Sequence, residues 1–240
     1  MKNWDWPTTY TKDKYDLLKF KFNGSETIEY NFSQCYQDMF VLSCLNGKRN
    51  GTYVEIGSGH PFISNNTALL ELGFDWIGVS LEIKEDEVNL FNNERKNVIA
   101  HGDATKVDYD DLFRVTNMGP HFDFLQVDCE PPATTFKALK KIPLDKYTFS
   151  VIVFEHDYYN HKDENSENSK VRDASRKYFK KHGYEMVVNN ISVDDSHPFE
   201  DWWVHPSYVD MDLISDLKCI TNKTKKAEDY ILGKIKTKSS

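Results

Sequence analysis

The stretch TYVEIGSGHP, residues 52 to 61, is a short apolar run that ends in two glycines. Runs rich in β-branched and aromatic residues are typical of buried parallel strands. Gly57 and Gly59 allow the backbone to turn sharply and leave its N–H groups free to approach a ligand. Glu55 adds a carboxylate at the carboxyl end of the strand, the edge where open α/β sheets bind small molecules. The stretch therefore predicts an α/β protein with a nucleotide-like ligand at this turn.

Strand-like and helix-like stretches alternate along the rest of the chain. The strand candidates are seven short apolar runs, at residues 52–57, 76–81, 97–101, 122–127, 149–154, 184–191 and 202–205. The helix candidates lie around them, at residues 33–47, 64–72, 84–95, 108–115, 131–141 and 170–182. This alternation predicts an α/β fold with a single doubly wound, mostly parallel seven-stranded sheet. The polar residues 156–170 are expected to form a loop over the site.

The length and composition indicate one domain with flanking segments. We expect an N-terminal extension over residues 1–32, the domain over 33–217, and a lysine-rich, solvated tail over 218–240. The net charge of −8 argues against a nucleic-acid partner. The four cysteines lack metal-ligand spacing, so reduced thiols are expected. No apolar run is long enough to span a bilayer, which predicts a cytoplasmic protein that is not in a membrane.

The sequence of the glycine turn distinguishes between classes of nucleotide-like ligand. A nicotinamide site would favour a third glycine, and this chain has Phe62 there. No lysine follows in the position that a P-loop requires, which disfavours ATP and GTP. The E-x-G-x-G pattern instead resembles the first motif of class I methyltransferases, which bind S-adenosylmethionine.

The ends of the next two strands offer groups for a nucleoside. Glu82 follows the second strand, where a carboxylate can accept hydrogen bonds from both ribose hydroxyls. A solvated acid at a strand end is the alternative. Asp103 and Ala104 follow the third strand, where an adenine amino group could be bound, although Gly-Asp is also common in ordinary turns.

Polar residues also follow the fourth and fifth strands. Asp128 and Glu130 come after the fourth, and Glu155, His156 and Asp157 come after the fifth. Polar groups beside buried runs cost desolvation free energy unless they lie in a cleft. We therefore expect these side chains at the place where the chemistry occurs.

Several stretches together resemble the FkbM family of S-adenosylmethionine-dependent methyltransferases. The resemblance covers roughly residues 33–206 and rests on SQCYQDMFVL, GTYVEIGSGHP, SNNTALLELGFDWIGVSLE, FLQVDCE, VIVFEHD, HGYE and FEDWWVHP, in this order. It implies a Rossmann-like class I fold and an O-methyltransferase that acts on a hydroxyl of a sugar, a glycan or another acceptor. The family often has I-D-x-E-G where this chain has Val127 to Pro131, and Asp-Gly where it has His60-Pro61. These departures affect the predicted identity of the acceptor more than that of the cofactor.

The resemblance also implies roles for individual residues. Glu55, Gly57 and Gly59 would hold the methionine end of the cofactor, Glu82 the ribose, and Asp103 with Ala104 the adenine. The further cofactor contacts that we predict are Gln37, Ser58, Asn66 and Asp128. Gln37 and Asp38 would belong to a helix that covers the site.

Methyl transfer to oxygen needs alignment of three atoms and removal of a proton. His156 is the first candidate for the base, because its ordinary pKa is near neutral pH. Asp128 and Glu155 could orient it, or all three could hold Mg²⁺ or another divalent cation that acidifies the acceptor. Trp202 and Trp203 could stack on a sugar, although alternation along a strand predicts that at least one is in the core.

Two other functions stay open at this point. The first is a cofactor-binding or interaction module without activity, whose mark would be loss of the acids after the fourth and fifth strands. These acids are present. The second is a nicotinamide-dependent oxidoreductase, which Phe62 disfavours.

Overall fold

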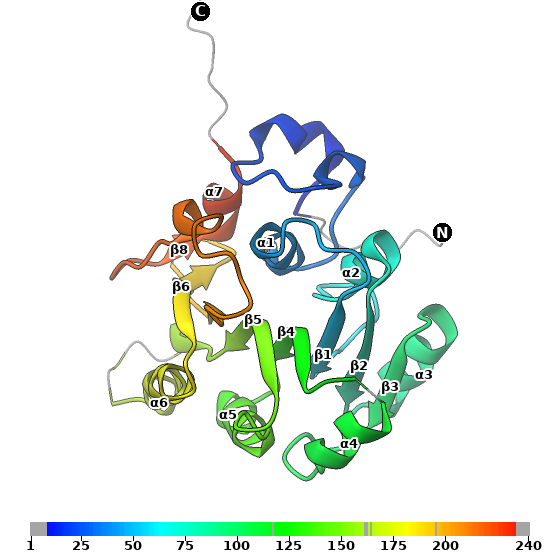
Figure 1. Cartoon of the computed structure of the whole chain (residues 1–240). Helices are drawn as coiled ribbons and strands as arrows, with labels where there is room; N and C mark the ends of the chain where they lie inside the picture. Colours follow the sequence, from blue (N-terminus) through cyan, green and yellow to red (C-terminus); the bar gives the residue numbers. More distant parts are fainter. Residues whose placement is uncertain (1–8, 117, 161–162, 164, 195, 234–240) are drawn as a thin grey trace, which may run out of the picture.

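The structure is a computed structural model that describes residues 9–116, 118–160, 163, 165–194 and 196–233. Within these residues a single sheet has eight strands in the order β3-β2-β1-β4-β5-β7-β6-β8 (Figure 1). The strands are β1 (Thr52–Ile56), β2 (Ile77–Glu82), β3 (Val98–His101), β4 (His121–Val127), β5 (Thr148–Glu155), β6 (Glu185–Ser192), β7 (Glu200–Val204) and β8 (Lys225–Lys226). The seven predicted strands are all present, within about two residues of the expected bounds.

The directions of the strands confirm a mostly parallel sheet. β1 to β5 are parallel to one another, whereas β7 is antiparallel to both β5 and β6. The dinucleotide-binding order 3-2-1-4-5-6 has no such reversed strand. The chain order changes direction between β1 and β4, so the crevice expected for a ligand lies at the carboxyl ends of these two strands.

Helices cover both faces of the sheet. The helices are α1 (Gln37–Cys44), α2 (Ala68–Phe74), α3 (Glu85–Glu94), α4 (Tyr109–Val115), α5 (Pro132–Lys141), α6 (Glu167–Lys181) and α7 (Ala227–Ile231). Figure 1 shows α4, α5 and α6 along one face and α1 with α2 on the other. Asp108 and Ser166 begin α4 and α6 by accepting a hydrogen bond from a backbone N–H of the first turn.

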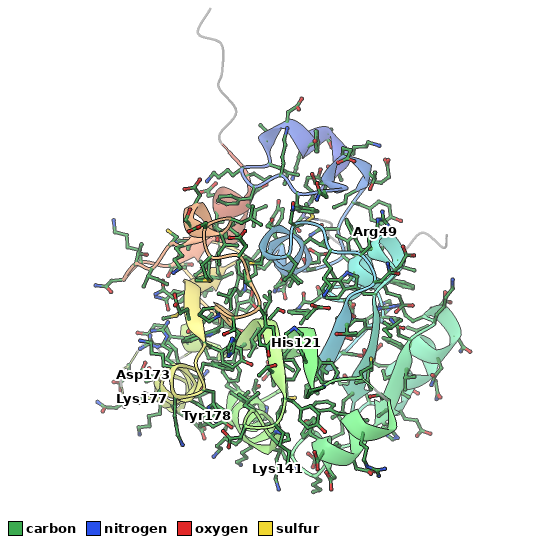
Figure 2. All side chains as sticks on the ribbon, viewed as in Figure 1. Arg49, His121, Lys141, Asp173, Lys177 and Tyr178 are labelled. Atoms are coloured by element: carbon green, nitrogen blue, oxygen red, sulfur yellow. The ribbon has the colours of Figure 1, made fainter. Side chains whose placement is uncertain are left out.

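The core is divided by the sheet, because successive side chains of a strand point to opposite faces. Tyr53 and Trp202 pack with α1 and α2. Val54 and Trp203 pack with α4, α5 and α6. Charged side chains lie on the outer surface of the helices, for example Lys141 of α5 and Lys177 of α6 (Figure 2).

The start of α1 differs from the expectation. The helix was expected from residue 33 onward, but it begins at Gln37. Ser33 instead donates its backbone N–H (3.1 Å) and its hydroxyl (2.5 Å) to the buried carboxylate of Asp38. That carboxylate also accepts from the backbone N–H of Phe32 (3.0 Å), so it joins the N-terminal segment to α1.

The expectation of a solvated tail is wrong for Lys225–Leu232. Residues 225–226 add β8 to the edge of the sheet, beside β6. Tyr230, Ile231 and Leu232 are buried, and Leu18 of the N-terminal segment forms a β-bridge with Leu232. Burial of the apolar side chains holds this segment against the rest of the domain, while the long side chains of its lysines extend to solvent. Residues 234–240 and 1–8 lie outside the described residues.

Two smaller expectations can be compared as well. All four cysteines are free, as predicted. Among the described residues, none of the helices combines the length and the apolar character that crossing a membrane requires.

Candidate active site

A cavity of about 350 Å³ opens at the carboxyl ends of β1, β2, β3 and β4, the edge predicted from the glycine turn. Its size falls in the range of about 300–1,000 Å³ that is usual for ligand sites. We call it the first cavity. It is lined by Gly57, Gly59, Leu81, Glu82, Ile83, Lys84, Gly102, Asp103, Ala104, Asp128, Cys129, Glu130 and Thr134.

The two glycines of the turn have different roles. Both have positive φ, 79° at Gly57 and 55° at Gly59. A Cβ atom on Gly57 would lie 1.7 Å from the backbone oxygen of Asp128, so glycine is required there by the close approach of two chain segments. A Cβ atom on Gly59 would meet no atom within 4 Å. The open space beside the turn is therefore at Gly59, on the wall of the first cavity.

Glu82 lies at the end of β2 with a carboxylate that is fixed by the backbone. Its Oε2 accepts from the N–H of Gly59 (2.8 Å), and its Oε1 accepts from the N–H groups of Ile83 and Lys84 (2.9 Å each). A carboxylate offers about four acceptor sites, so capacity for a further donor remains. The side chain is 6% exposed and lines the first cavity. It is thus held in place as an acceptor for a ligand hydroxyl.

Asp103 and Ala104 form the part of the wall that follows β3. The Asp103 Oδ1 accepts from the N–H (2.9 Å) and the hydroxyl (2.7 Å) of Thr105, and Lys106 lies 3.0 Å from Oδ2. Hydrogen bonds from Thr105 and Lys106 lower the pKa of Asp103 to about 2. This carboxylate is therefore ionised at neutral pH and able to accept from an amino group.

Four residues predicted as cofactor contacts do not line the first cavity: Gln37, Glu55, Ser58 and Asn66. Glu55 is fully buried and accepts from the side chains of Asn65 (3.2 Å), Thr67 (3.0 Å) and Ser80 (2.6 Å). Burial raises its pKa to about 7, although Arg95 opposes the shift. The geometry gives Glu55 a structural role: it connects β1 to β2 and to the segment before α2.

Asp128 and Glu155 stand between the first cavity and a second one. The second cavity, of about 160 Å³, is lined by Gln34, Glu155, Asp157, Tyr159, Ser192, Val193, Asp194, His197 and Phe199. Asp128 lines the first cavity, Glu155 lines the second, and the two carboxyl groups are hydrogen-bonded. Burial raises the pKa of both, and their mutual repulsion raises that of Glu155 further. One proton shared between them relieves that repulsion.

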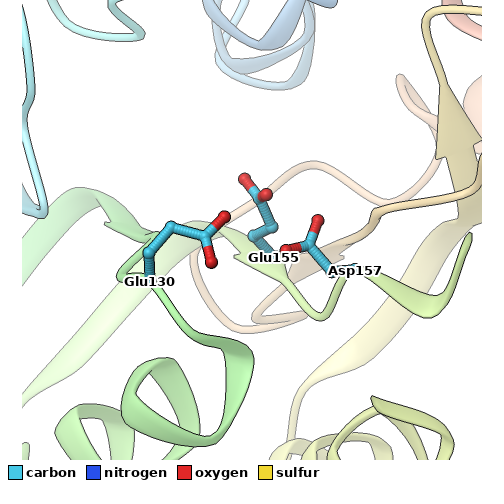
Figure 3. Close-up of side chains that lie close together, drawn as sticks. All are labelled: Glu130, Glu155 and Asp157. Carbon is cyan, nitrogen blue, oxygen red and sulfur yellow. The ribbon is translucent and has the colours of Figure 1, made fainter. Parts of the chain in front are cut away.

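Glu155 of this pair also belongs to a cluster of three carboxylates, which Figure 3 shows. Ligand atoms of Glu130, Glu155 and Asp157 all lie within 4.8 Å of one another. Glu130 is exposed and Asp157 is buried. We call these three residues the carboxylate cluster. All three were expected at the place where the chemistry occurs, but of the three only Glu155 was predicted as a catalytic residue or metal ligand.

His156 does not lie with these groups. It is 0% exposed, and its Nε2 lies 3.5 Å from Oδ1 of Asp201. Asp201 also accepts two hydrogen bonds from Arg176 of α6, at 2.7 and 2.9 Å. Neighbouring residues of a strand point to opposite faces, so Glu155 reaches the cavities while His156 points toward α6. The geometry does not support His156 as base or metal ligand.

The tryptophan pair is also removed from the cavities. Trp202 and Trp203 are both 0% exposed, so neither can stack on a sugar. The Trp202 indole donates to Glu200 at 2.8 Å, and burial raises the pKa of Glu200 to about 8. The prediction that at least one tryptophan is in the core is confirmed.

Sequence reasoning missed residues that line the cavities from outside the strands. Thr134 and Lys84 line the first cavity, whereas Gln34, Tyr159 and His197 line the second. None of them directly follows an apolar strand, so the signal that found Glu82 and Glu155 could not find them. Only Tyr159 belongs to a segment, residues 156–170, that was expected over the site. Residues 161, 162 and 164 of that segment lie outside the described residues.

The fold is similar to solved structures of methyltransferases. A candidate O-methyltransferase from Klebsiella pneumoniae is 10% identical, with 81% of this chain and 86% of that one covered and a TM-score of 0.51. An O-methyltransferase from Bacillus cereus in complex with S-adenosylhomocysteine is 15% identical over the same shares, with a TM-score of 0.47. A candidate rRNA methylase from Clostridium thermocellum is 11% identical, covers 65% of this chain and 89% of its own, and has a TM-score of 0.44.

A scan against protein-family models finds no match, and a search of curated proteins finds none either. The prediction of a Rossmann-like methyltransferase fold is confirmed by the strand order and by the Klebsiella structure. At 10% identity this likeness establishes the fold alone. The resemblance to the FkbM family stays a prediction.

Proposed function

We propose that the protein is an S-adenosylmethionine-dependent methyltransferase that transfers a methyl group to a hydroxyl, most simply one of a sugar or glycan. The observation that carries this proposal is the first cavity, where Gly59 and Glu82 stand at the strand ends of a methyltransferase fold. The residues present fit the cofactor. Open space lies beside Gly59, and the fixed carboxylate of Glu82 suits a ribose diol.

The remaining wall residues suit the other parts of the cofactor. Asp103 and Ala104 lie beyond Glu82, where the adenine would be bound, and Asp128 lies at the opposite side near the second cavity. The cofactor would supply a methyl group already activated by the positive charge of its sulfonium. The carboxylates of Glu82 and Asp128 would attract that charge.

The hydrogen-bonded pair of Asp128 and Glu155 is placed to remove the proton of the acceptor. As the acceptor oxygen forms a bond to the methyl carbon, the carbon–sulfur bond breaks and leaves a neutral thioether. The hydroxyl proton would pass to Glu155 while the proton of Glu155 passes to Asp128. Each carboxyl group of the pair then ends protonated, and no charge is left on the pair.

The second cavity supports a polyhydroxyl acceptor. Its polar lining offers side-chain acceptors and donors, such as Gln34, Ser192 and Asp194, beside the aromatic rings of Tyr159 and Phe199. Aromatic faces together with hydrogen-bonding groups suit sugar rings. A strongly anionic acceptor is disfavoured, because Glu155, Asp157 and Asp194 would repel it.

A nicotinamide-dependent oxidoreductase is not favoured by the site. Phe62, which replaces the third glycine of that motif, is only 8% exposed and packs in the core with α1 and α2. The reversed strand β7 is also absent from the dinucleotide-binding order.

Transfer of a labelled methyl group from S-adenosylmethionine to a panel of sugar nucleotides and glycans tests the proposal. Glu155→Gln should lower turnover at least about a hundredfold, as loss of a proton acceptor does. Its affinity for S-adenosylhomocysteine should stay unchanged, because Glu155 does not line the first cavity. The matched control is Glu167→Gln, an exposed acid at the start of α6. Unchanged turnover in Glu155→Gln would remove this residue from the chemistry.

A further inference from the structure

Cys219 and Lys225 form a close thiol–amine pair at the edge of the sheet where β8 lies. The Lys225 Nζ is 2.7 Å from the Cys219 Sγ and also donates to the Cys219 carbonyl oxygen at 3.0 Å. The nitrogen–sulfur distance falls at the lower limit for N–H···O hydrogen bonds, which run from about 2.7 to 3.2 Å. Because sulfur is a larger atom than oxygen, Nζ and Sγ are closer than an ordinary hydrogen bond would place them.

This separation is similar to that of two atoms bonded to one common atom. Backbone N and C, joined through Cα by two single bonds, lie about 2.5 Å apart. Bonds to sulfur are longer than bonds to carbon, so a pair that includes sulfur lies slightly farther apart. One bridging atom between Nζ and Sγ would therefore require little movement of either side chain. Oxygen is the atom that oxidation adds to a thiol.

The backbone holds both residues against the same strand, β6. The N–H of Cys219 donates to a carbonyl of β6 (2.8 Å), and Lys225 pairs with Ile191 of that strand. The segment between them is fixed as well, because the Asn189 side chain donates to the Thr221 carbonyl (2.7 Å) and accepts from its N–H (3.0 Å). The short distance between amine and thiol therefore follows from the fold.

The Lys225 amine has no charged partner in the part of the chain that the structure describes, where none of the ion pairs includes it. The residue is half-buried, so its ammonium loses part of its hydration without the return that a carboxylate would give. Conversion of this ammonium into a neutral nitrogen therefore breaks no ion pair.

The other three thiols are protected from oxidants. The thiolate is the reactive form of cysteine, and accessible thiols react before buried ones. Cys35 and Cys44 are each 1% exposed, and burial raises the pKa of both. Cys129 is half-buried, and burial raises its pKa to about 12. Cys219 is half-buried as well, and it has an amine in contact with its sulfur.

We propose that Cys219 and Lys225 are a modification site, at which peroxide joins the two side chains through a nitrogen–oxygen–sulfur bridge that thiols reverse. The Cys219 sulfur attacks one peroxide molecule: a sulfur–oxygen bond forms, the oxygen–oxygen bond breaks, and water leaves, which gives a sulfenic acid. The Lys225 amine, after loss of a proton to solvent, attacks a second peroxide in the same way and becomes a hydroxylamine. The hydroxylamine oxygen then attacks the sulfenic sulfur and displaces water.

The electrons of this sequence balance. Sulfur and nitrogen each give up two electrons, and each peroxide molecule accepts two as it is reduced to water. The product has one oxygen more and two hydrogens fewer than the thiol and amine together. An external thiol that is oxidised to a disulfide supplies the electrons for the reverse reaction, which restores both side chains and releases the oxygen as water.

The bridge would close residues 219–225 into a ring at the edge of the sheet. β8 has two residues, so without the bridge its local opening costs little free energy. Residues 226–228, which follow directly, line a cavity of about 310 Å³ that shares Gln34 and Val193 with the second cavity. Oxidation would therefore fix a wall that adjoins the second cavity.

Treatment of the full chain with hydrogen peroxide, followed by peptide mass mapping before and after dithiothreitol, tests the proposal. We expect a crosslink between Cys219 and Lys225 whose mass exceeds that of the two peptides by one oxygen less two hydrogens. Dithiothreitol should remove it, which distinguishes it from a methyl group of nearly equal mass. Lys225→Arg keeps the positive charge but should give no crosslink. Lys223→Arg, which alters an exposed lysine of the same segment, should crosslink as the unaltered chain does.

Hydrogen exchange measures the structural effect. After oxidation, exchange in residues 225–232 should slow at least about threefold in the unaltered chain and in Lys223→Arg, but not in Lys225→Arg. Equal exchange before and after crosslinking would contradict the stabilising role of the bridge.

Two results of the mass mapping would overturn the proposal. One is the same set of peptide products from Lys225→Arg as from the unaltered chain, such as a sulfinic acid at Cys219 without a crosslink. The other is a link that has lost two hydrogens without a gain of oxygen, because it would be a direct nitrogen–sulfur bond. Neither the cofactor nor an acceptor enters these experiments, so their outcome is independent of the proposed methyl transfer.

Discussion

Replacement of each glycine in the turn after β1 separates chain packing from ligand binding. The Cβ atom of Gly57→Ala would lie 1.7 Å from the carbonyl oxygen and 2.8 Å from the carbonyl carbon of Asp128. Contacts between non-bonded atoms are favourable only near about 3.5–4 Å. The conflict is with backbone, and Asp128 is tied to β1 because its N–H donates to the carbonyl of Ile56 (2.9 Å). Relief would require the ends of β1 and β4 to separate.

The magnitude follows from comparison with Gly59→Ala. Both positions have positive φ, which costs an alanine roughly 1–2 kcal/mol. Gly59→Ala should lose only this amount, because its Cβ atom meets nothing within 4 Å. Gly57→Ala should lose more than about 4 kcal/mol, since steric overlap adds to the backbone cost. Valine at Gly57 would therefore test folding rather than the volume available to a ligand.

Urea denaturation followed by circular dichroism measures both free energies of unfolding. Gly59→Ala should remain folded and should bind S-adenosylhomocysteine about tenfold more weakly, because its methyl group enters the first cavity. Equal denaturation midpoints for the two variants would refute the packing role of Gly57. Undiminished binding by Gly59→Ala would show that the ligand does not approach this turn.

Two further predictions concern buried charges beside the site. In the folded chain, burial raises the pKa of Glu200 from its ordinary value of 4.5 to about 8. The contribution of Glu200 to stability is therefore full below pH 4.5 and is lost as pH rises through about 8. Glu200→Gln should flatten the decline in denaturation midpoint between about pH 5 and 8.5, and an unchanged slope would contradict this. Asp201→Asn should cost about 3–5 kcal/mol by leaving the mostly buried Arg176 without its charged partner. Asp173 is exposed, so Asp173→Asn should lower the free energy of unfolding by less than about 1 kcal/mol. Equal losses of unfolding free energy for Asp201→Asn and Asp173→Asn in urea denaturation would show that the buried pair of Arg176 and Asp201 does not stabilise the fold.

The strands and the ligand edge could be predicted from the sequence because each has a local signal. β1, β2, β4 and β5 are apolar runs bounded by polar residues, and burial of such runs determines where they lie. Glu82 was found because it is the acid at the end of β2, and the structure places it on the cavity wall. Here the local pattern and the tertiary structure agree.

The functional side chains were harder to assign, since position along the chain does not tell which face of the sheet a residue occupies. Glu155 and His156 are neighbours, but the first lines the second cavity and the second packs toward α6 with Asp201. Gly57 illustrates a second limit. A glycine needed for contact with another segment has the same sequence signature as one needed for a ligand.

The C-terminal segment shows a third limit. Its lysines indicated solvent exposure, whereas the packing of Tyr230, Ile231 and Leu232 depends on the N-terminal segment around Leu18, more than two hundred residues away. A local pattern carries no information about a partner at such a separation. The tail could therefore not be placed from its composition.

Calorimetric titration of S-adenosylhomocysteine, with NAD as the alternative ligand, tests the central claim most directly. The unaltered chain, Glu82→Gln and Glu85→Gln should be compared, because Glu85 is the exposed first residue of α3 and does not line the first cavity. We expect one site for S-adenosylhomocysteine, no binding of NAD, and a loss of roughly 1–3 kcal/mol of binding free energy in Glu82→Gln alone. Binding of NAD in place of S-adenosylhomocysteine, or equal affinity in all three proteins, would contradict the account.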